Sequence, residues 1–323
     1  MRALTITAQQ IGEALTPALL MDSIAEMHRA PHALLDENLL GAPAAGGEES
    51  HLLVRSAWQP PHALGVKLAR VFPGNVRRGL PSITADYLLF SGADGRLLAA
   101  VDGIALTCWK TAADSGLGAR FLARKNVRTM LMVGAGAMAP HLVRAHRSAR
   151  PSIKKILLWN RTRARAAQLA QTLAAETAGA EIEVRDDLAP AVGEAGLISC
   201  ATMAPAPLIK GAWLAPGAHL DLVGAFTPHM READDGCLRL GSLFVDSRKT
   251  TSHIGEIKIP LAAGVIQPAD ICAELAELCN GEHPGRRTEE EITVYKNGGG
   301  GHLDLMTARA IYRRLSAPPH KNC

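Results

Sequence analysis

The spacing of apolar residues along the chain changes near residue 126, which divides it into two patterned regions. In the first region, apolar residues at helical spacing over residues 8–40 predict helices, and the Ala-, Gly- and Pro-rich residues 41–50 predict a loop. Short apolar runs then predict strands at residues 51–58, 63–72, 83–91 and 97–102. Because a hairpin turn at Gly92–Gly95 and other short links join these strands, we expect them to be antiparallel. A helix is predicted over residues 107–123.

From residue 126 onward, short apolar runs alternate with longer helix-compatible segments. The predicted strands of this region are 129–133, 155–159, 181–185, 196–200, 219–223 and 243–246. This alternation predicts a doubly wound parallel sheet of the Rossmann type. The last segment, residues 291–315, begins as a strand, ends as a helix and can return to the first region. We therefore expect an α/β protein with two domains, a discontinuous α+β domain of residues 1–117 with 300–323 and a Rossmann domain of residues 118–299.

A glycine motif marks the first turn of the second region. The predicted strand at residues 129–133 ends in GAGAMA (residues 134–139), which has the form G-x-G-x-x-A. Gly134 suits a tight turn, Gly136 lets the backbone approach a pyrophosphate, and Ala139 lets a helix pack close to the strand. An ordinary glycine turn is the alternative, but the order strand, turn, helix, strand favours dinucleotide binding. The candidate cofactor contacts in this turn are Gly134, Gly136, Ala137 and Met138.

The residues after the next predicted strand, 155–159, indicate which dinucleotide binds. An NAD-binding unit usually carries Asp or Glu there for the ribose hydroxyls. This chain instead carries Asn160, followed by Arg161, Thr162 and Arg163. Because a carboxylate repels a 2′-phosphate and arginines bind one, these residues favour NADPH, with NADH still possible. The alternative is that the arginines simply begin a solvated helix.

Other candidate cofactor contacts follow later strands of the same sheet. The carboxyl ends of parallel strands meet at one edge, where ligands bind. The residues expected at that edge are Ala201, Thr202, Met203, Val223 and Gly224.

Composition and charge exclude several classes of protein. The 323 residues are 47% hydrophobic and 20% charged, which is typical of a soluble enzyme. The net charge of +4 is small and spread out, which gives no indication of nucleic-acid binding. No apolar run is long enough for a membrane span, and the N-terminus lacks a signal-type apolar segment. The 6 cysteines have no C-x-x-C spacing, so reduced thiols in a cytoplasmic protein are expected, and no residue cluster has metal-ligand spacing.

Several separated motifs occur in an order that resembles the ornithine cyclodeaminase/mu-crystallin family over nearly the whole chain. They are GVK (65–67), FPGN (72–75), GIALTCWKTAA (103–113), GAGAMA (134–139), SCAT (199–202), VGAFTP (223–228), IPLAAGVI (259–266) and VYK (294–296). The family contains cyclodeaminases, ketimine reductases, amino-acid dehydrogenases and mu-crystallins. The resemblance implies a first domain that binds substrate and forms a homodimer. It also implies that the glycine-rich segment at Gly298 lies near the nicotinamide.

One position helps to choose among the family's activities. Cyclodeaminases of this family carry an aspartate two residues after the Val-Gly glycine, where this chain has Phe226. Phenylalanine cannot take up or deliver a proton. The pattern over residues 223–232 is instead similar to the Δ1-pyrroline-2-carboxylate and Δ1-piperideine-2-carboxylate reductase branch. We therefore expect NAD(P)H-dependent reduction of a cyclic imino acid to L-proline or L-pipecolate. The alternatives are a cyclodeaminase with recycled NAD, a binding protein like the mu-crystallins, and an amino-acid dehydrogenase.

The resemblance also implies a cationic clamp for the substrate carboxylate. Lys67 matches the family's lysine, and Lys110 stands where the family usually has an arginine, so we expect both to act on substrate. Arg55 is a candidate replacement for an N-terminal arginine that this chain lacks, and Thr111 is a further candidate contact. A solvated lysine on a strand is the alternative for Lys67. The possible proton carriers are Asp221, His229, His302 and Asp304.

Overall fold

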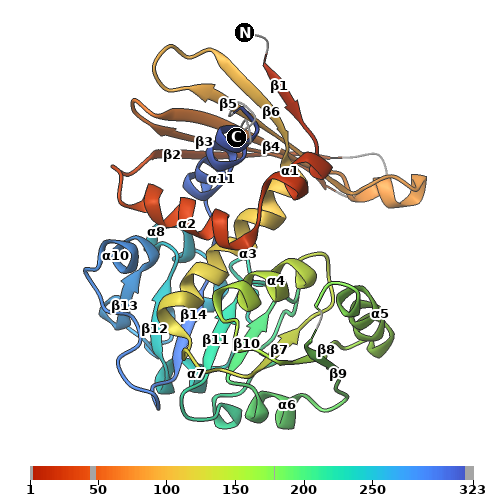
Figure 1. Ribbon diagram of the computed structural model, residues 1–323, viewed down its shortest axis with the longest axis vertical. Coiled ribbons are helices and arrows are strands. Elements are labelled where there is room, and N and C mark those ends of the chain that lie inside the picture. The colour runs from red at the N-terminus through yellow and green to blue at the C-terminus, as the bar shows by residue number, and fades with distance from the viewer. Residues whose placement is uncertain (1–2, 44–48, 178, 317–323) are drawn as a thin grey trace, which may run out of the picture. The chain divides into compact units, whose positions relative to one another are not determined.

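The computed structural model describes residues 3–43, 49–177 and 179–316. The chain divides into two compact units, Met1–Lys110 with Gly300–Cys323 and Thr111–Gly299, called here the first and second units (Figure 1). The boundary between Lys110 and Thr111 lies inside helix α3 (Gly103–Leu122), seven residues before the junction expected from the sequence.

The first unit contains a sheet with the strand order β1-β6-β5-β4-β3-β2 among the described residues. Its strands are β1 (Leu4–Ile6), β2 (Leu34–Pro43), β3 (Glu49–Gln59), β4 (Ala63–Val71), β5 (Ile83–Ser91) and β6 (Leu97–Asp102). Strands β3 to β6 pair in antiparallel fashion, as predicted, and β2 adds to β3 in the same way, whereas β1 pairs with β6 in parallel. The register places Arg55 of β3 opposite Lys67 of β4, and Lys67 opposite Tyr87 of β5. These three side chains therefore share one face of the sheet.

Helix α11 (Gly301–Ser316) covers that face of the sheet, and α1 (Ala8–Ala14) and α2 (Pro17–His28) pack against α11. The 3₁₀ helix η1 (Pro73–Arg78) follows β4. Thr7 and Thr16 cap α1 and α2 through their hydroxyl oxygens, and Pro17 occupies the first helical position of α2. Helix α11, from the other end of the chain, packs against α2 and against β3, β4 and β5 (Figure 1).

The opposite face of the sheet is apolar and remains accessible. On the side facing α11, the buried positions of β3 and β4 are Ala57, Gln59, Ala63, Gly65 and Lys67, whereas most of the alternate positions are only partly buried. The accessible positions carry Leu52, Val54, Leu64, Val66 and Leu68. A sheet packed on one side only normally carries polar residues on the other, so this face departs from the usual alternation.

Three local predictions for the first region differ from the structure. Residues 34–43 form the edge strand β2 rather than a continuation of the helices, because they pair with β3 along their whole length. The predicted loop at 41–50 is strand at 41–43 and 49–50, and residues 44–48 lie outside the described residues. Helix α3 begins at Gly103, four residues before the prediction. The Asp102 carboxylate accepts a hydrogen bond from the Ala105 N–H at 2.9 Å and so starts the helix there.

The second unit contains a parallel sheet with the order β13-β12-β14-β11-β10-β7-β8-β9 among the described residues. Its strands are β7 (Thr129–Val133), β8 (Lys155–Trp159), β9 (Glu181–Val184), β10 (Leu197–Cys200), β11 (His219–Leu222), β12 (Ser242–Val245), β13 (Ile271–Glu274) and β14 (Thr293–Lys296). The predicted Rossmann-type parallel sheet is confirmed, and β13 is a strand that the sequence did not predict. The order reverses between β7 and β10, which is where ligands bind in such sheets.

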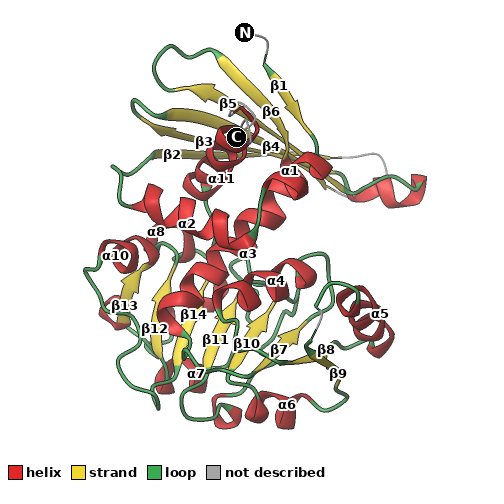
Figure 2. Ribbon diagram, in the orientation of Figure 1, coloured by secondary structure: helices red, strands yellow, loops and turns green. Residues whose placement is uncertain are grey.

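Helices and short 3₁₀ turns connect the strands of the second unit. They are α4 (Ala139–Ala149), α5 (Arg163–Ala174), α6 (Leu188–Glu194), α7 (Asp235–Leu240), α8 (Arg248–Thr251), α9 (Gly255–Ala262), α10 (Leu275–Asn280), η2 (Gly211–Trp213) and η3 (Pro268–Asp270). Figure 2 shows the strands flanked by these helices. The core on the sheet includes Leu131, Leu157, Ile198, Leu220 and Val294, all fully buried. Continuous apolar strands of this kind are expected where both faces of a sheet are covered.

Candidate functional site

The turn after β7 lies at the point where the strand order reverses. Gly134 has a φ of +103°, and its N–H donates to the Trp159 carbonyl at 2.8 Å. A Cβ at this position would lie 2.5 Å from the carbonyl oxygen of Ala201, which follows β10. Only glycine therefore allows the turns after β7 and β10 to approach so closely. Gly136 and Ala137 are exposed, and a Cβ on Gly136 would meet nothing within 4 Å.

The start of helix α4 is suited to an anion. Met138 occupies the N-cap position, and its side chain has no oxygen with which to bind the first N–H groups. The 11-residue helix therefore begins without a side-chain cap and presents its positive end beside the exposed glycine turn. A dinucleotide pyrophosphate fits this arrangement.

Asn160 connects the glycine turn after β7 to the loop after β8. Its side-chain oxygen accepts from the Ala135 N–H at 3.1 Å, and its amide donates to the Thr162 carbonyl at 2.9 Å. Arg163 pairs with Asp186 at 2.6 Å. Arg161 is exposed and forms no ion pair within the part of the chain that the structure describes. Of the two predicted phosphate-binding arginines, Arg161 is thus the one not already engaged by a carboxylate.

The turns after β10 and β11 meet through Glu232, which was not among the predicted site residues. Thr202 and Gly224, both predicted cofactor contacts, donate to the buried Glu232 carboxylate. Burial raises the pKa of Glu232 to about 7, although the charge of Lys296 acts in the opposite direction. Met203 and Val223 lie in the same two turns, and the Val223 N–H donates to the Cys200 carbonyl at 2.8 Å.

Close packing of the backbone explains why residue 298 is a glycine. A Cβ there would lie 2.7 Å from the Thr251 methyl group and 3.3 Å from Asp246, so the segment packs closely against α8. Its proximity to the nicotinamide stays a prediction. Asn297 precedes it, and its amide donates to the Thr111 carbonyl and to the Ser115 hydroxyl, at 3.0 Å in both cases.

A cluster of cations occupies the covered face of the sheet in the first unit. The buried Lys67 ammonium donates to the Thr107 hydroxyl at 2.6 Å and to Asp304 of α11 at 3.2 Å. Arg55 lies in the adjacent register position, 3.8 Å from the second oxygen of Asp304, and pairs with the half-exposed Glu37 at 2.5 Å. Lys110, on α3, is also buried and acts electrostatically on Asp304. The three predicted substrate-binding cations thus share one buried carboxylate.

Asp304 is ionised in this environment. Burial by itself would raise its pKa, but the charges of Lys67, Lys110 and Arg55 outweigh burial and hold the pKa below its usual value. Its Oδ2 atom accepts no hydrogen bond from the described residues, and the buried Tyr87 hydroxyl on the same sheet face is likewise without one. Buried polar atoms of this kind normally have a partner. They suit a polar ligand or water at this cluster.

The other possible proton carriers lie in different surroundings. Burial lowers the pKa of His302 to about 3, so its imidazole is neutral. His229 is exposed. Asp221 is fully buried and accepts hydrogen bonds from the side chains of Ser115, Ser199 and His146. Asp304 is therefore the possible proton carrier that lies beside the predicted lysines. Asp221 forms its hydrogen bonds in the interior of the second unit.

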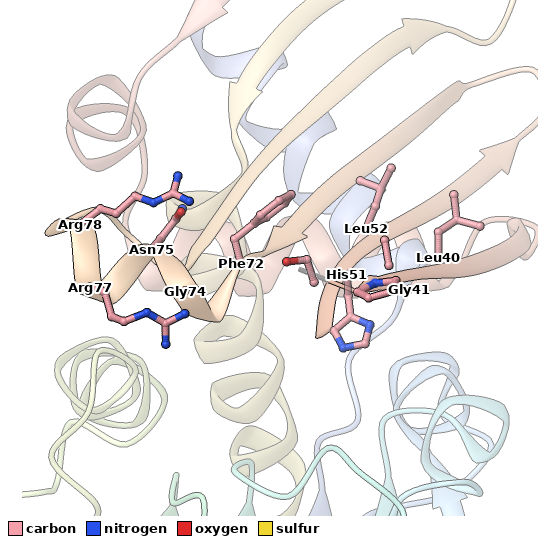
Figure 3. A pocket seen from close by; sticks show the side chains of 12 residues that line it. Leu40, Gly41, His51, Leu52, Phe72, Gly74, Asn75, Arg77 and Arg78 are labelled. Carbon is pink, nitrogen blue, oxygen red and sulfur yellow. The ribbon is translucent and has the colours of Figure 1, made fainter. Parts of the chain in front are cut away.

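A cavity of about 550 Å³ lies elsewhere in the first unit. Leu40 and Leu52, from β2 and β3, line one part of it, and Arg77 and Arg78 of η1 line another (Figure 3). None of its lining residues is a predicted site residue. Within the described residues, there is no group of His, Cys, Asp and Glu suited to a metal ion, and no helix is long and apolar enough to cross a membrane.

The family of the chain follows from its sequence as a whole. Residues 54–318 match the model of the ornithine cyclodeaminase/mu-crystallin family. The chain belongs to this family. It is similar to a Δ(1)-pyrroline-2-carboxylate reductase of Paracoccus denitrificans, with 44% identity over 299 residues that cover 92% of each protein. The predicted family and its reductase branch are therefore confirmed.

Solved structures of relatives share the fold of this family member. One is the Thermococcus litoralis Δ(1)-pyrroline-2-carboxylate reductase in complex with NADH and L-proline. It has a TM-score of 0.85 and 28% identity, and the match covers 96% of this chain and 97% of that one. Another is an archaeal alanine dehydrogenase dimer with bound NAD, with a TM-score of 0.85, 25% identity and coverage of 97% and 96%.

Proposed function

We propose that this family member reduces a cyclic imino acid, Δ1-pyrroline-2-carboxylate or Δ1-piperideine-2-carboxylate, to L-proline or L-pipecolate with NAD(P)H. The observation that carries the proposal is the cluster of buried Lys67 and Lys110 and partly buried Arg55 around the buried Asp304. A buried positive cluster suits a small anionic substrate. The similarity to Δ(1)-pyrroline-2-carboxylate reductases supports an imino acid as this anion.

The protein's part in this reaction is to bind and orient the imino acid. Lys67 and Lys110 bind its carboxylate, and Arg55 and Thr111 are proposed as further contacts. Thr107 and Asp304 hold the Lys67 ammonium in place, so little rearrangement is needed on binding. A bound reduced nicotinamide supplies a hydride to the imine carbon, and the protonated imine nitrogen becomes the amine.

Phe226 argues against ornithine cyclodeamination as the activity. Its side chain is 58% exposed and stands where the cyclodeaminase branch has a proton-handling aspartate. Asp221, the nearest aspartate in sequence on the same strand and loop, is fully buried and already accepts three side-chain hydrogen bonds. Neither residue provides a free acid at this loop.

NADPH is the proposed cofactor, with NADH as the weaker donor. The residues that would hold it are Gly134, Gly136, Ala137, Met138, Asn160, Arg161, Thr162, Arg163, Ala201, Thr202, Met203, Val223, Gly224 and Gly298. The preference rests on Arg161, which is exposed after β8, and on Asn160 in place of a carboxylate. The two solved relatives above bind NADH or NAD, which supports the dinucleotide site and leaves the phosphate preference to experiment.

A homodimer formed through the first unit is also proposed. The outer sheet face is apolar, and Leu34, Leu40 and Trp58 along β2 and β3 are exposed. Contiguous apolar patches of this kind mark interaction sites, and the related alanine dehydrogenase is a dimer. Light scattering after gel filtration tests this, and a mass of one chain, 34.2 kDa, would contradict it. The cytoplasmic location expected from the sequence stays a prediction.

The function is tested by following NADPH oxidation with five- and six-membered cyclic imines in parallel with ammonia release from ornithine. The proposal predicts NADPH consumption with an imine and no ammonia from ornithine. Ammonia release without net NADPH consumption would instead identify a cyclodeaminase. NADPH binding without turnover of any substrate would favour a binding protein.

A further inference from the structure

We propose that Glu232 is a positioning residue of the dinucleotide site, which fixes the turns after β10 and β11 relative to each other. This positioning role rests on the proposed function in one respect, namely that these turns contact the cofactor. Glu232 itself is fully buried and lies between β11 and α7. It therefore acts through the turns and makes no contact of its own with a ligand.

The carboxylate of Glu232 binds one turn with each oxygen. Oε1 accepts from the Thr202 N–H at 2.7 Å and from the Thr202 hydroxyl at 2.8 Å. Oε2 accepts from the Gly224 N–H at 2.6 Å and from the Ala225 N–H at 3.4 Å. Because each of the two oxygens serves a different turn, the side chain is a cross-link between two neighbouring strand ends rather than a cap on one of them.

The two turns approach so closely that the link leaves little freedom. A Cβ on Gly224 would lie 2.0 Å from the Thr202 carbonyl oxygen and 2.3 Å from its nitrogen. From the other side, the Lys296 ammonium donates to the Leu222 and Ala225 carbonyls at 3.0 and 2.8 Å. The segment 222–225 is thus held by the Glu232 carboxyl group and by the Lys296 ammonium.

The backbone of Glu232 is anchored independently of its side chain. Its N–H donates to Glu256 of α9 at 2.7 Å, and its carbonyl accepts from the Leu208 and Ile209 N–H groups at 2.8 and 2.9 Å. An anchored backbone with a bridging carboxylate is the arrangement expected of a group that sets the position of ligand-binding turns. Loss of one acceptor oxygen should therefore loosen the turns while the surrounding fold persists.

The test is Glu232→Gln, which keeps the shape and replaces one acceptor oxygen with an NH₂ group that can only donate. The two N–H or O–H groups that donated to the replaced oxygen then face another donor, and their hydrogen bonds are lost. The dissociation constant for NADPH, measured by fluorescence titration, is expected to rise about tenfold or more. The kcat at saturating NADPH should change far less than KM for NADPH. Asp114→Asn is the matched control, because it neutralises another buried carboxylate of the second unit that binds the Tyr295 hydroxyl.

The outcomes separate this inference from the proposed function. If the wild-type protein binds no NADPH, the proposed function fails. If it binds NADPH and Glu232→Gln binds equally well, whether or not the melting temperature falls, the positioning role is overturned. Should Glu232→Gln fail to fold, Glu232→Asp keeps the carboxylate but shortens the side chain, so that it no longer reaches both turns. A rise in its NADPH dissociation constant would support the role, and an unchanged value would contradict it.

Discussion

The Lys67 ammonium lies 3.2 Å from a carboxylate oxygen of Asp304, and both side chains are buried in the first unit. Lys67 comes from β4 and Asp304 from α11, which are 237 residues apart in the chain. Breaking a buried pair by removing one charge costs about 3–5 kcal/mol, because the remaining charge is left uncompensated. The pair therefore orders the central cation of the proposed substrate site.

Asp304→Asn should impair substrate use. The amide no longer attracts the Lys67 ammonium, so the substrate carboxylate meets a less ordered cation. We expect kcat/KM for the cyclic imine to fall by about tenfold or more, measured by steady-state NADPH oxidation. Asp86→Asn is the control, since it removes an acid from an exposed ion pair with Arg70 in the same sheet. Exposed pairs of this kind contribute about 0–1 kcal/mol, and equal effects of the two substitutions would refute the assignment.

Lys110→Ala should weaken the use of substrate with a smaller effect on cofactor binding. Loss of a desolvated charge partner costs on the order of 2–5 kcal/mol, which appears as a lower kcat/KM for the imine. Lys110→Arg restores the residue type that the family usually carries and should retain most of the activity. An unchanged kcat/KM in Lys110→Ala would remove Lys110 from the site.

Arg161→Ala should reduce the preference for NADPH. Loss of a charged hydrogen bond to the 2′-phosphate is expected to raise KM for NADPH by about tenfold or more, with little change in KM for NADH. Arg239→Ala serves as the control, because Arg239 is an exposed arginine on α7. Equal changes in the KM values for NADPH and NADH in Arg161→Ala would show that this arginine does not bind the 2′-phosphate.

Acid stability should depend on His28. Burial, with a smaller contribution from His32, lowers the pKa of His28 to about 4 from 6.5. The unfolded chain therefore binds the proton more readily, and stability is lost as pH falls from about 6.5 towards 4. The loss from this group amounts to about 3 kcal/mol. His28→Gln should flatten the free energy of unfolding over this range, whereas exposed His253→Gln should not. Parallel pH profiles for wild type and His28→Gln would contradict this.

The sequence predicted the parts of the fold that local pattern determines. Strands 83–91, 97–102, 129–133 and 155–159 were predicted with their bounds, because apolar runs and turn residues define them. Residues 34–43 were missed as a strand, since their leucines also fit helical spacing and pairing with β3 decides the outcome. Exposed edge strands carry little periodic signal of their own.

Only part of the candidate site could be predicted from the sequence. Lys67 and Lys110 were proposed through a family resemblance, and Asp304, which the structure places beside them, was named only as one of four possible proton carriers. Its pairing depends on the return of α11 to the first unit. Glu232 was missed, because a single glutamate in a loop has no distinguishing pattern. Its role becomes visible only when the turns after β10 and β11 are brought together.

The central claim is tested most directly by incubating the protein with NADPH and Δ1-pyrroline-2-carboxylate and measuring the amino acid formed. The account predicts one L-proline for each NADPH oxidised, with the rate sharply reduced in Asp304→Asn. Absence of proline, together with no reduction of the six-membered imine, would contradict it.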